Sequence, residues 1–316
     1  MSGGGGVDMA TAVGPVTLAN PVMTASGTAG HGAELSAYCD LESLGAVVVK
    51  SVSTFAWPGN RVPRLAPTAG GMLNSVGLQG SGVATWLAED LPALARTNAT
   101  VVASIWGRRV DDFAEAASAL AGASPAVVAV EVNVSCPNVE DGSSMFAHSP
   151  AATAAAVTAA RASGLPLWVK LSPNTTDVRP IAAAALDAGA VALTLVNTVM
   201  GMGIDIDERS ARLGGVTGGL SGAAIHPVAV RAVFECRAAF PDAGIVGVGG
   251  VRSGADAVEL LMAGADAVQV GTATLVDPRA PVRVRDGIAR WCRRHGVARV
   301  RDVVGAAHEG AKVRAR

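Results

Sequence analysis

Short apolar segments alternate along the chain with longer Ala-rich segments, and this alternation is the strongest structural signal in the sequence. The apolar segments span residues 21–26, 46–51, 101–106, 127–135, 167–172, 190–198, 244–250 and 267–273. Most are continuously apolar and rich in β-branched residues, as strands buried on both faces are. Segments with the apolar spacing of helices lie between most of them, at residues 111–122, 150–163, 177–188, 221–239 and 253–263. A strand followed by a helix, repeated in this way, predicts parallel strand pairing.

Eight candidate strands with no change of composition between them favour a closed (β/α)8 barrel, an α/β fold of the TIM-barrel type, over an open sheet. We therefore expect residues 1–316 to form one barrel domain, with residues 1–10 as a flexible tail. Residues 52–100 are rich in Pro and Gly and too long for a single connection. We expect them to form an inserted loop and strand region over the carboxyl-terminal face of the barrel, where such insertions shape active sites.

Composition and charge narrow the class of protein. Hydrophobic residues make up 50% of the chain but aromatic residues only 3%, which predicts a core of Ala, Val, Leu and Ile side chains. The formal net charge is -1 without blocks of like charge, so nothing indicates a nucleic-acid or membrane partner. The start of the chain lacks the features of a signal peptide and the four cysteines are widely spaced, so we expect a reduced, cytoplasmic protein. No Cys or His cluster has the spacing of metal ligands, and no metal is assigned.

Polar or glycine residues close most of the predicted strands, and in such barrels the chemistry lies at the carboxyl ends of the strands. Lys50 and Lys170 each close an apolar strand. Burying a lysine is costly unless it meets an anion, so a bound anionic group is implied, unless each lysine reaches solvent from the barrel rim. The last two strands end in glycines, at 247–251 and 270–274. Backbone N–H groups there could bind a phosphate, although a glycine after a strand can also be only a turn.

Amide side chains and one cysteine complete the candidate chemistry. An amide offers both a donor and an acceptor, which suits a pyrimidine or another cyclic amide ligand, although a single Asn more often serves in a turn. Cys136 precedes Pro137, which lacks an N–H and favours departure from the strand, so we expect the thiol at the barrel mouth. We expect Cys39, Cys236 and Cys292 to be inert core residues. The candidate asparagines are Asn74, Asn133, Asn138 and Asn197.

These residues belong to motifs that follow one another in a fixed order from Pro21 to past Thr272: ASGT, VKS, NSVGLQ, NVSCPN, VKLSPN, LVNTVMGMGIDI, GGVTGGLSG, GVGGV and VGTA. In this order the chain resembles the dihydroorotate dehydrogenases. It is most similar to class 1, whose catalytic base is a cysteine, because class 2 enzymes carry a serine there and an N-terminal helical extension. The segments NSVGLQ and GMGIDIDERSARLGGVTGGLSG are closer to class 1B than to the fumarate-using class 1A.

The resemblance implies an FMN-dependent enzyme that oxidises (S)-dihydroorotate to orotate in de novo pyrimidine (UMP) biosynthesis. Cys136 would take the proton from C5 while a hydride leaves C6 for flavin N5. Lys170 would lie by the N1/O2 edge of the flavin and stabilise negative charge on reduced FMN. Lys50 would contact both flavin and substrate and act beside Cys136 as a second catalytic residue.

The resemblance also assigns binding residues. Those for FMN are Ser26, Gly27, Lys50, Ser51, Ser104, Asn133, Lys170, Val196, Gly222, Gly249, Gly250, Gly271 and Thr272. Those for the substrate are Lys50, Asn74, Val76, Gly77, Leu78, Asn133, Asn138, Asn197 and Thr198. Two positions depart from the common pattern of the family and leave the flavin contacts there open. Ser104 stands where many relatives have Asn, and Ala223 stands where Pro is common.

Class 1B enzymes pass electrons to NAD through a second subunit that carries FAD and a 2Fe–2S cluster. This chain has neither the GxGxxG dinucleotide fingerprint nor the spacing of a four-cysteine cluster, so we expect those groups only on a partner. The family arrangement is a homodimer of barrels, flanked in class 1B by two partner subunits as a heterotetramer.

Three alternatives remain open. The chain could be a fumarate-dependent class 1A enzyme. It could be another FMN barrel for reduced pyrimidines, like a dihydropyrimidine dehydrogenase module or a dihydrouridine synthase, although the net charge of -1 does not favour an RNA substrate. A flavin-free, phosphate-binding lyase or synthase would explain the glycines after the last two strands but not Lys170 or the asparagines.

Overall fold

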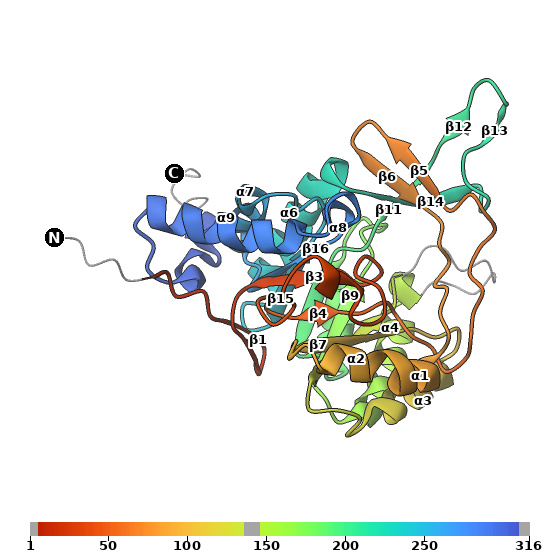
Figure 1. Ribbon diagram of the computed structural model, residues 1–316, viewed down its shortest axis with the longest axis horizontal. Coiled ribbons are helices and arrows are strands. Elements are labelled where there is room, and N and C mark those ends of the chain that lie inside the picture. Colours follow the sequence, from red (N-terminus) through yellow and green to blue (C-terminus); the bar gives the residue numbers. More distant parts are fainter. Residues whose placement is uncertain (1–5, 136–145, 310–316) are drawn as a thin grey trace.

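The computed structural model describes residues 6–135 and 146–309, and its central element is a sheet of eight parallel strands (Figure 1). In the order of pairing the strands are β3 (Val22–Thr24), β16 (Ala267–Val270), β15 (Gly244–Val248), β10 (Ala192–Leu195), β9 (Leu167–Leu171), β8 (Val127–Asn133), β7 (Val101–Ile105) and β4 (Val47–Val48). Each strand lies within one of the eight apolar segments of the sequence. Their continuous apolar character follows from burial on both faces.

The two ends of this sheet meet. Met23 of β3 forms a parallel bridge with Ala46, which directly precedes β4. Beside this bridge the backbone N–H of Gly45 donates to the carbonyl oxygen of Val22 over 2.8 Å. Because these contacts join the first strand to the last, the sheet curves into a barrel. The predicted (β/α)8 fold is confirmed.

Helices follow the barrel strands and cover their outer side (Figure 1). They are α3 (Val110–Leu120), α4 (Pro150–Ala160), α5 (Arg179–Asp187), α6 (His226–Ala239), α7 (Gly254–Ala263) and α9 (Ala280–Arg294), while the short α8 (Thr272–Val276) lies at the mouth of the barrel. The start of α7 is fixed by a capping box, in which the Ser253 hydroxyl accepts from the N–H of Asp256 and the Asp256 carboxylate accepts from the N–H of Ser253. The helix expected over 221–239 starts later than predicted, at His226, because the residues up to Ser221 pair in a strand.

In the described residues the hydrophobic core of the barrel has two layers, and aromatic rings contribute more to it than the composition predicted. The outer layer lies between strands and helices and includes the fully buried Trp86 and Phe113. The inner layer fills the amino-terminal end of the barrel around Trp168. The N-terminal hairpin of β1 (Thr11–Val13) and β2 (Val16–Leu18) packs its apolar side chains into that layer. It therefore closes the end of the barrel opposite the carboxyl ends of the strands.

The insertion expected over residues 52–100 contains two different structures. A hairpin of β5 (Leu65–Thr68) and β6 (Gly71–Asn74) pairs with β14 (Thr217–Ser221), which pairs in turn with β11 (Val199–Met202). Half of this four-stranded antiparallel sheet thus comes from the segment after β10, which the sequence pattern did not reveal as strands. Next to β11, the short strands β12 (Ile204–Asp205) and β13 (Ser210–Ala211) form a further hairpin.

The rest of the expected insertion belongs to the helical layer. Residues 83–95 form α1 (Val83–Thr85), the π-helical turn η2 (Trp86–Asp90) and α2 (Leu91–Ala95). Trp86, Leu91 and Leu94 of this segment are buried in the outer core. The expectation that all of residues 52–100 lie above the barrel was therefore wrong, because 83–95 supply the helix that the β4-to-β7 connection needs.

The N-terminal segment is attached to the rest of the protein from an earlier residue than expected. The N–H of Asp8 donates to the carbonyl oxygen of Ala298 over 2.9 Å, and the N–H of Val300 donates to the carbonyl oxygen of Asp8 over 2.8 Å. The tail expected over residues 1–10 is thus attached from Asp8 onward, next to the turn η6 (Val300–Val303); residues 1–5 lie outside the described part of the chain. Among the described residues, no helix combines the length and the apolar character needed to cross a membrane.

Candidate active site

A cavity of about 850 Å³ lies at the carboxyl ends of the barrel strands, beneath the four-stranded sheet. The barrel contributes residues that follow or end its strands, and the sheet contributes Met72, Asn74 and Ser221. The cavity falls within the size range of small-molecule and cofactor sites.

Nearly all residues expected to bind cofactor or substrate line this one cavity. They are Ser26, Gly27, Lys50, Ser51, Asn74, Val76, Gly77, Leu78, Asn133, Lys170, Val196, Asn197, Thr198, Gly222, Gly249, Gly250, Gly271 and Thr272. The fold thus brings together two sets of residues that are scattered over most of the chain.

Ser104 is the exception among the described site residues. It is completely buried in β7 and does not line the cavity. Its Oγ lies 2.8 Å from Oγ of Ser51 and 3.4 Å from Oε1 of Glu131. Its side chain thus lies behind Ser51 and supports the cavity wall from the barrel interior, and the expected contact of Ser104 with a cofactor stays a prediction.

Cys136 and Asn138 lie outside the described residues. The other three cysteines have the character expected of inert thiols. Burial raises the pKa of the Cys236 thiol to about 12, and burial also raises the pKa of Cys39 and of Cys292. These thiols stay protonated at neutral pH, so none of the three is a base at neutral pH.

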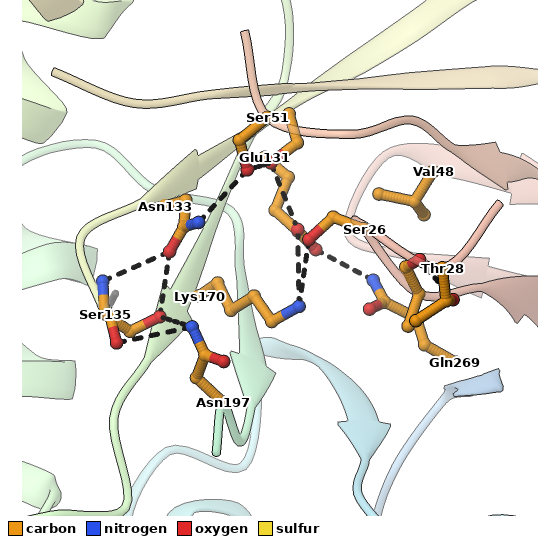
Figure 2. Close-up of polar contacts among 12 residues, drawn as sticks. Ser26, Thr28, Val48, Ser51, Glu131, Asn133, Ser135, Lys170, Asn197 and Gln269 are labelled. Atoms are coloured by element: carbon orange, nitrogen blue, oxygen red, sulfur yellow. Dashed lines mark hydrogen bonds and ion pairs between the residues drawn. The ribbon is translucent and has the colours of Figure 1, made fainter. Parts of the chain in front are cut away.

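A buried carboxylate in the barrel interior was not anticipated. Glu131 of β8 is completely buried, and its Oε2 accepts a hydrogen bond of 2.8 Å from Nε2 of Gln269 in β16 (Figure 2). Its Oε1 lies 3.9 Å from Nζ of Lys170, whose Nζ also donates to Oγ of Ser26 over 3.0 Å. The Lys170 ammonium thus has a counter-charge within the protein. Burial of Lys170 alone therefore does not require a bound anion, contrary to the argument from the sequence.

The sequence held a signal for Glu131. It is the only charged residue in the apolar segment 127–135 and stands two positions before Asn133. Side chains two apart on a strand share a face, so Glu131 and Asn133 both point into the barrel. A charged side chain is almost never fully buried unless it has a partner. A carboxylate in a strand that is buried on both faces therefore predicts a partner across the barrel.

The asparagines at the cavity are held in fixed orientations (Figure 2). Nδ2 of Asn133 donates to Oγ of Ser51 over 3.0 Å, and its Oδ1 accepts from the hydroxyl of Ser135 over 3.0 Å. Nδ2 of Asn197 donates to the same Ser135 hydroxyl over 2.8 Å. From the sheet above, Nδ2 of Asn74 donates to the carbonyl oxygen of Gly219 over 3.2 Å. These contacts reduce the rotational freedom of the amides, so their further hydrogen-bonding positions face the cavity in defined directions.

One end of the cavity is lined by glycines that leave no room for a side chain. Gly250, after β15, has φ +69°, and a Cβ there would lie 2.6 Å from Cβ of His226. Gly222 has φ +95°, and a Cβ there would lie 2.8 Å from Cα of Gly71. Beside them the Thr272 hydroxyl donates to Oγ of Ser221 over 2.8 Å. A ligand can approach the backbone closely here, as a phosphate does when it binds to N–H groups.

A second cavity, of about 600 Å³, borders the first at Gly27, Lys50 and Val76. Its wall includes His31 and Trp57. Burial lowers the pKa of His31 from the ordinary value of 6.5; nearby Asp90 acts in the opposite direction, while the charge of Lys50 lowers it further. His31 is thus held as a neutral imidazole near one of the two candidate lysines.

The rim of the main cavity carries residues that the sequence analysis did not single out. Leu65, Leu275 and Val276 line it and are half or more exposed. Arg252 lines it near Gly250 and lies 3.5 Å from the carboxylate of Asp256. Single exposed apolar or charged residues carry no recognisable pattern in a sequence, which explains why they were missed.

These features define the class of the protein. The barrel has a large cavity at the carboxyl ends of its strands, with two lysines at the wall and one end lined by glycines, and it belongs to the class of ligand-binding (β/α)8 enzymes. The family model described as dihydroorotate dehydrogenase matches residues 8–291. The chain belongs to the dihydroorotate dehydrogenase family, and the resemblance seen in the motifs is confirmed.

Individual relatives cover almost the whole chain. A protein of Pelobacter propionicus is 48% identical over 300 residues, which are 95% of this chain and 98% of the relative. One of Desulforudis audaxviator is 47% identical over 303 residues, which are 96% of this chain and 98% of the relative. Both are described as dihydroorotate dehydrogenase B (NAD(+)), catalytic subunit. A crystal structure of DHODH from Eimeria tenella in complex with ferulenol has a TM-score of 0.79 at 22% identity, over 95% of this chain and 89% of that chain, and it supports the barrel fold.

Proposed function

We propose that this protein is the catalytic subunit of an NAD-linked dihydroorotate dehydrogenase, which oxidises (S)-dihydroorotate to orotate in UMP biosynthesis. The observation that carries the proposal is the similarity, over nearly the full length of both chains, to relatives described with that name. The cavity supports it, because it collects almost all residues that the family resemblance assigns to cofactor and substrate.

FMN is the cofactor in this proposal, and the residues present fit it. Gly222, Gly249, Gly250, Gly271 and Thr272 line one end of the cavity, where a phosphate can approach the backbone N–H groups of the glycines closely. When bound, FMN would supply the hydride acceptor, at N5 of the flavin. Lys170, Ser26 and Val196 also lie on the cavity wall, and we assign them to the ring system of the flavin.

Lys170 places a positive charge at the cavity, with its side chain only 6% exposed. In the proposed enzyme this charge stabilises the negative charge that the flavin gains on reduction. An ammonium fixed by Ser26 and Glu131 does this with little reorganisation, because its partners already hold it in place.

The substrate side of the proposal rests on the amides and on Lys50. Asn133 and Asn197 offer donors and acceptors to the orotate ring, and Lys50 offers a positive charge to the substrate carboxylate. Further contacts would come from Asn74, Val76, Gly77, Leu78, Asn138 and Thr198.

Cys136 is the proposed base that removes the C5 proton of dihydroorotate. It lies outside the described residues, so its role rests on the NVSCPN motif. The raised pKa of Cys39, Cys236 and Cys292 supports the assignment by leaving these three without the reactivity that a base requires.

The route of the electrons forms the last part of the proposal. The words "catalytic subunit" in the description of the relatives support a second subunit, on which we place FAD and a 2Fe–2S cluster. A homodimer of this chain with two such partners, in the cytoplasm, is the proposed assembly.

The test is anaerobic reduction of the FMN-loaded chain, followed by its absorbance, with dihydroorotate and with dihydrouracil. Bleaching of the flavin by dihydroorotate alone is expected, because dihydrouracil lacks the carboxylate. Bleaching by dihydrouracil alone would favour a dihydropyrimidine dehydrogenase-like enzyme, and protein that takes up no FMN would favour the flavin-free barrel.

Steady-state assays of the isolated chain with fumarate, NAD and a quinone analogue then test the acceptor. We expect no NAD reduction until an iron–sulfur flavoprotein subunit is added. Efficient use of fumarate would instead place the enzyme in class 1A.

A further inference from the structure

The interior of the barrel contains a hydrogen-bonded chain that ends on the carboxylate of Glu131 (Figure 2). Glu131 accepts from Gln269 at 2.8 Å and from the hydroxyl of Ser104 at 3.4 Å, and its Oε1 lies 3.9 Å from the ammonium of Lys170. A completely buried carboxylate is stable only with such partners. Glu131 is therefore the charged centre on which these side chains converge.

The order of donors in this chain is fixed by the number of hydrogens available. Ser104 has one hydroxyl hydrogen and donates it to Glu131. In the 2.8 Å contact between the two serines, Ser51 must then be the donor. Oγ of Ser51 accepts in turn from Nδ2 of Asn133 over 3.0 Å. Every donor from Asn133 onward thus points toward the carboxylate.

This order decides which way the amide of Asn133 faces. Its Nδ2 is directed to Ser51, so its Oδ1 faces the N–H and hydroxyl of Ser135, from which it accepts at 3.2 and 3.0 Å. The same Oε1 of Glu131 that accepts from Ser104 lies 3.9 Å from the Lys170 ammonium, which also donates to Oγ of Ser26. Asn133 and Lys170 both line the cavity, whereas Glu131 and Ser104 do not.

We propose that Glu131 is a positioning residue that orients Lys170 directly and Asn133 through Ser104 and Ser51. It links the charged group assigned to the flavin with an amide assigned to both flavin and substrate, without touching either ligand. The proposal deepens the proposed function and rests on it for the identity of the two ligands.

Two substitutions separate the two parts of this proposal. The ion-pair branch is the contact of Glu131 with Lys170, and the branch to Asn133 is the hydrogen-bonded chain through Ser104 and Ser51. In Glu131→Gln the new amide oxygen can still accept from Ser104. Its NH₂ group faces Nε2 of Gln269, and once the Gln269 amide turns over by 180° this NH₂ group can donate to Oε1 of Gln269, an atom without a hydrogen-bond partner among the described residues. This variant removes the counter-charge of Lys170 and keeps the chain to Asn133. Ser104→Ala does the reverse, because it breaks the chain to Asn133 and leaves the ion pair in place.

The ion-pair branch is tested by thermal unfolding of the full chain at a fixed excess of FMN. Glu131→Gln and Lys170→Met each leave one charge buried without its partner, so each lowers the melting temperature. The double variant removes both charges, and we expect it to lose much less than the sum of the single losses. Additive losses would overturn this branch. If a single variant does not fold, recovery of folded protein in the double variant supports the pairing. A double variant that also fails to fold refutes the pairing.

The branch to Asn133 is tested by titrating the FMN-loaded chain with orotate and following the flavin absorbance. Ser104→Ala should raise the orotate dissociation constant about fivefold, as expected for the loss of one hydrogen bond. Ser163→Ala is the matched control, because Ser163 is a buried serine outside the cavity. An unchanged orotate constant in Ser104→Ala would overturn this branch. Failure of the unsubstituted chain to bind orotate would refute the proposed function instead, and the unfolding experiment would still stand.

Discussion

Nδ1 of His226 lies 2.8 Å from the carbonyl oxygen of Gly249, so the first residue of α6 is attached to the glycine turn that follows β15. The same ring contacts Oε2 of Glu259 in α7 through Nε2, at 3.2 Å. The backbone of Gly249 and Gly250 is thereby held from behind, on the side away from the cavity.

We expect His226→Ala to weaken FMN binding about fivefold, because the loss of one hydrogen bond of about 1 kcal/mol leaves the turn less well ordered. The measurement is an FMN titration that follows flavin fluorescence. His308→Ala is the control, since His308 also contacts a backbone carbonyl, but that of Ala263, which unlike Gly249 does not line the cavity. Equal FMN affinities for His226→Ala and the unsubstituted chain would show that the turn does not need this contact.

Gly250→Ala should abolish most FMN binding. The substitution adds strain at a positive φ, of about 1 kcal/mol, and it places a Cβ 2.6 Å from Cβ of His226. Gly122→Ala is a matched control, because Gly122 has φ +67° and a Cβ there would meet nothing within 4 Å. FMN content after purification and the melting temperature measure both effects. We expect a similar loss of stability from strain in both variants, but loss of FMN only in Gly250→Ala.

Cys136→Ala should retain FMN and slow flavin reduction by dihydroorotate by a factor on the order of 10² to 10⁴, the usual contribution of a general base. Stopped-flow absorbance measures this rate. Since a thiolate is the base, reduction of the unsubstituted enzyme should speed up as the pH rises toward about 8.5. Cys39→Ala serves as the control thiol, because burial raises the pKa of Cys39. Near-normal reduction in Cys136→Ala, or a flat pH profile, would contradict the assignment.

His31 should make the stability of the protein depend on pH below neutrality. Burial lowers the pKa of His31 in the folded state from the ordinary 6.5, so the unfolded chain takes up this proton first as the pH falls. Its contribution to stability is complete above about pH 6.5 and is lost as the pH falls through the folded-state pKa. The midpoint of urea unfolding should therefore drop more between pH 7.5 and 5.5 in the unsubstituted chain than in His31→Gln. His148→Gln, at an exposed histidine, should behave like the unsubstituted chain, and parallel pH profiles for all three would disprove the idea.

Much of the fold could be predicted because its main signal is local. A strand buried on both faces must be apolar at successive positions, so each of the eight barrel strands was visible within a few residues. Strands β11 and β14 were not visible, because β14 contains Gly218 and Gly219 and pairs with β6, about 145 residues away. The helix over residues 83–95 was hidden in a segment whose Pro and Gly content indicated loops.

The candidate site was predictable where chemistry and position along a strand coincide. Lys50, Lys170 and Asn133 end apolar segments, and parallel strands in a barrel bring their carboxyl ends to one mouth. That Ser51 and not Ser104 lines the cavity could not be predicted, because it depends on a contact between two residues 53 positions apart in the chain.

The sequence by itself determined the barrel, the mouth at which the polar residues gather and the family, because periodicity and motif order are properties of the chain alone. Only the tertiary structure decided that Glu131 meets Lys170 and Gln269, and that the hairpin β1–β2 fills the opposite end of the barrel. These contacts join residues far apart in the chain, and they exist only once barrel closure sets which inward-facing side chains meet. For this reason the internal charge of the barrel and the order of its hydrogen bonds could be seen only in the folded molecule.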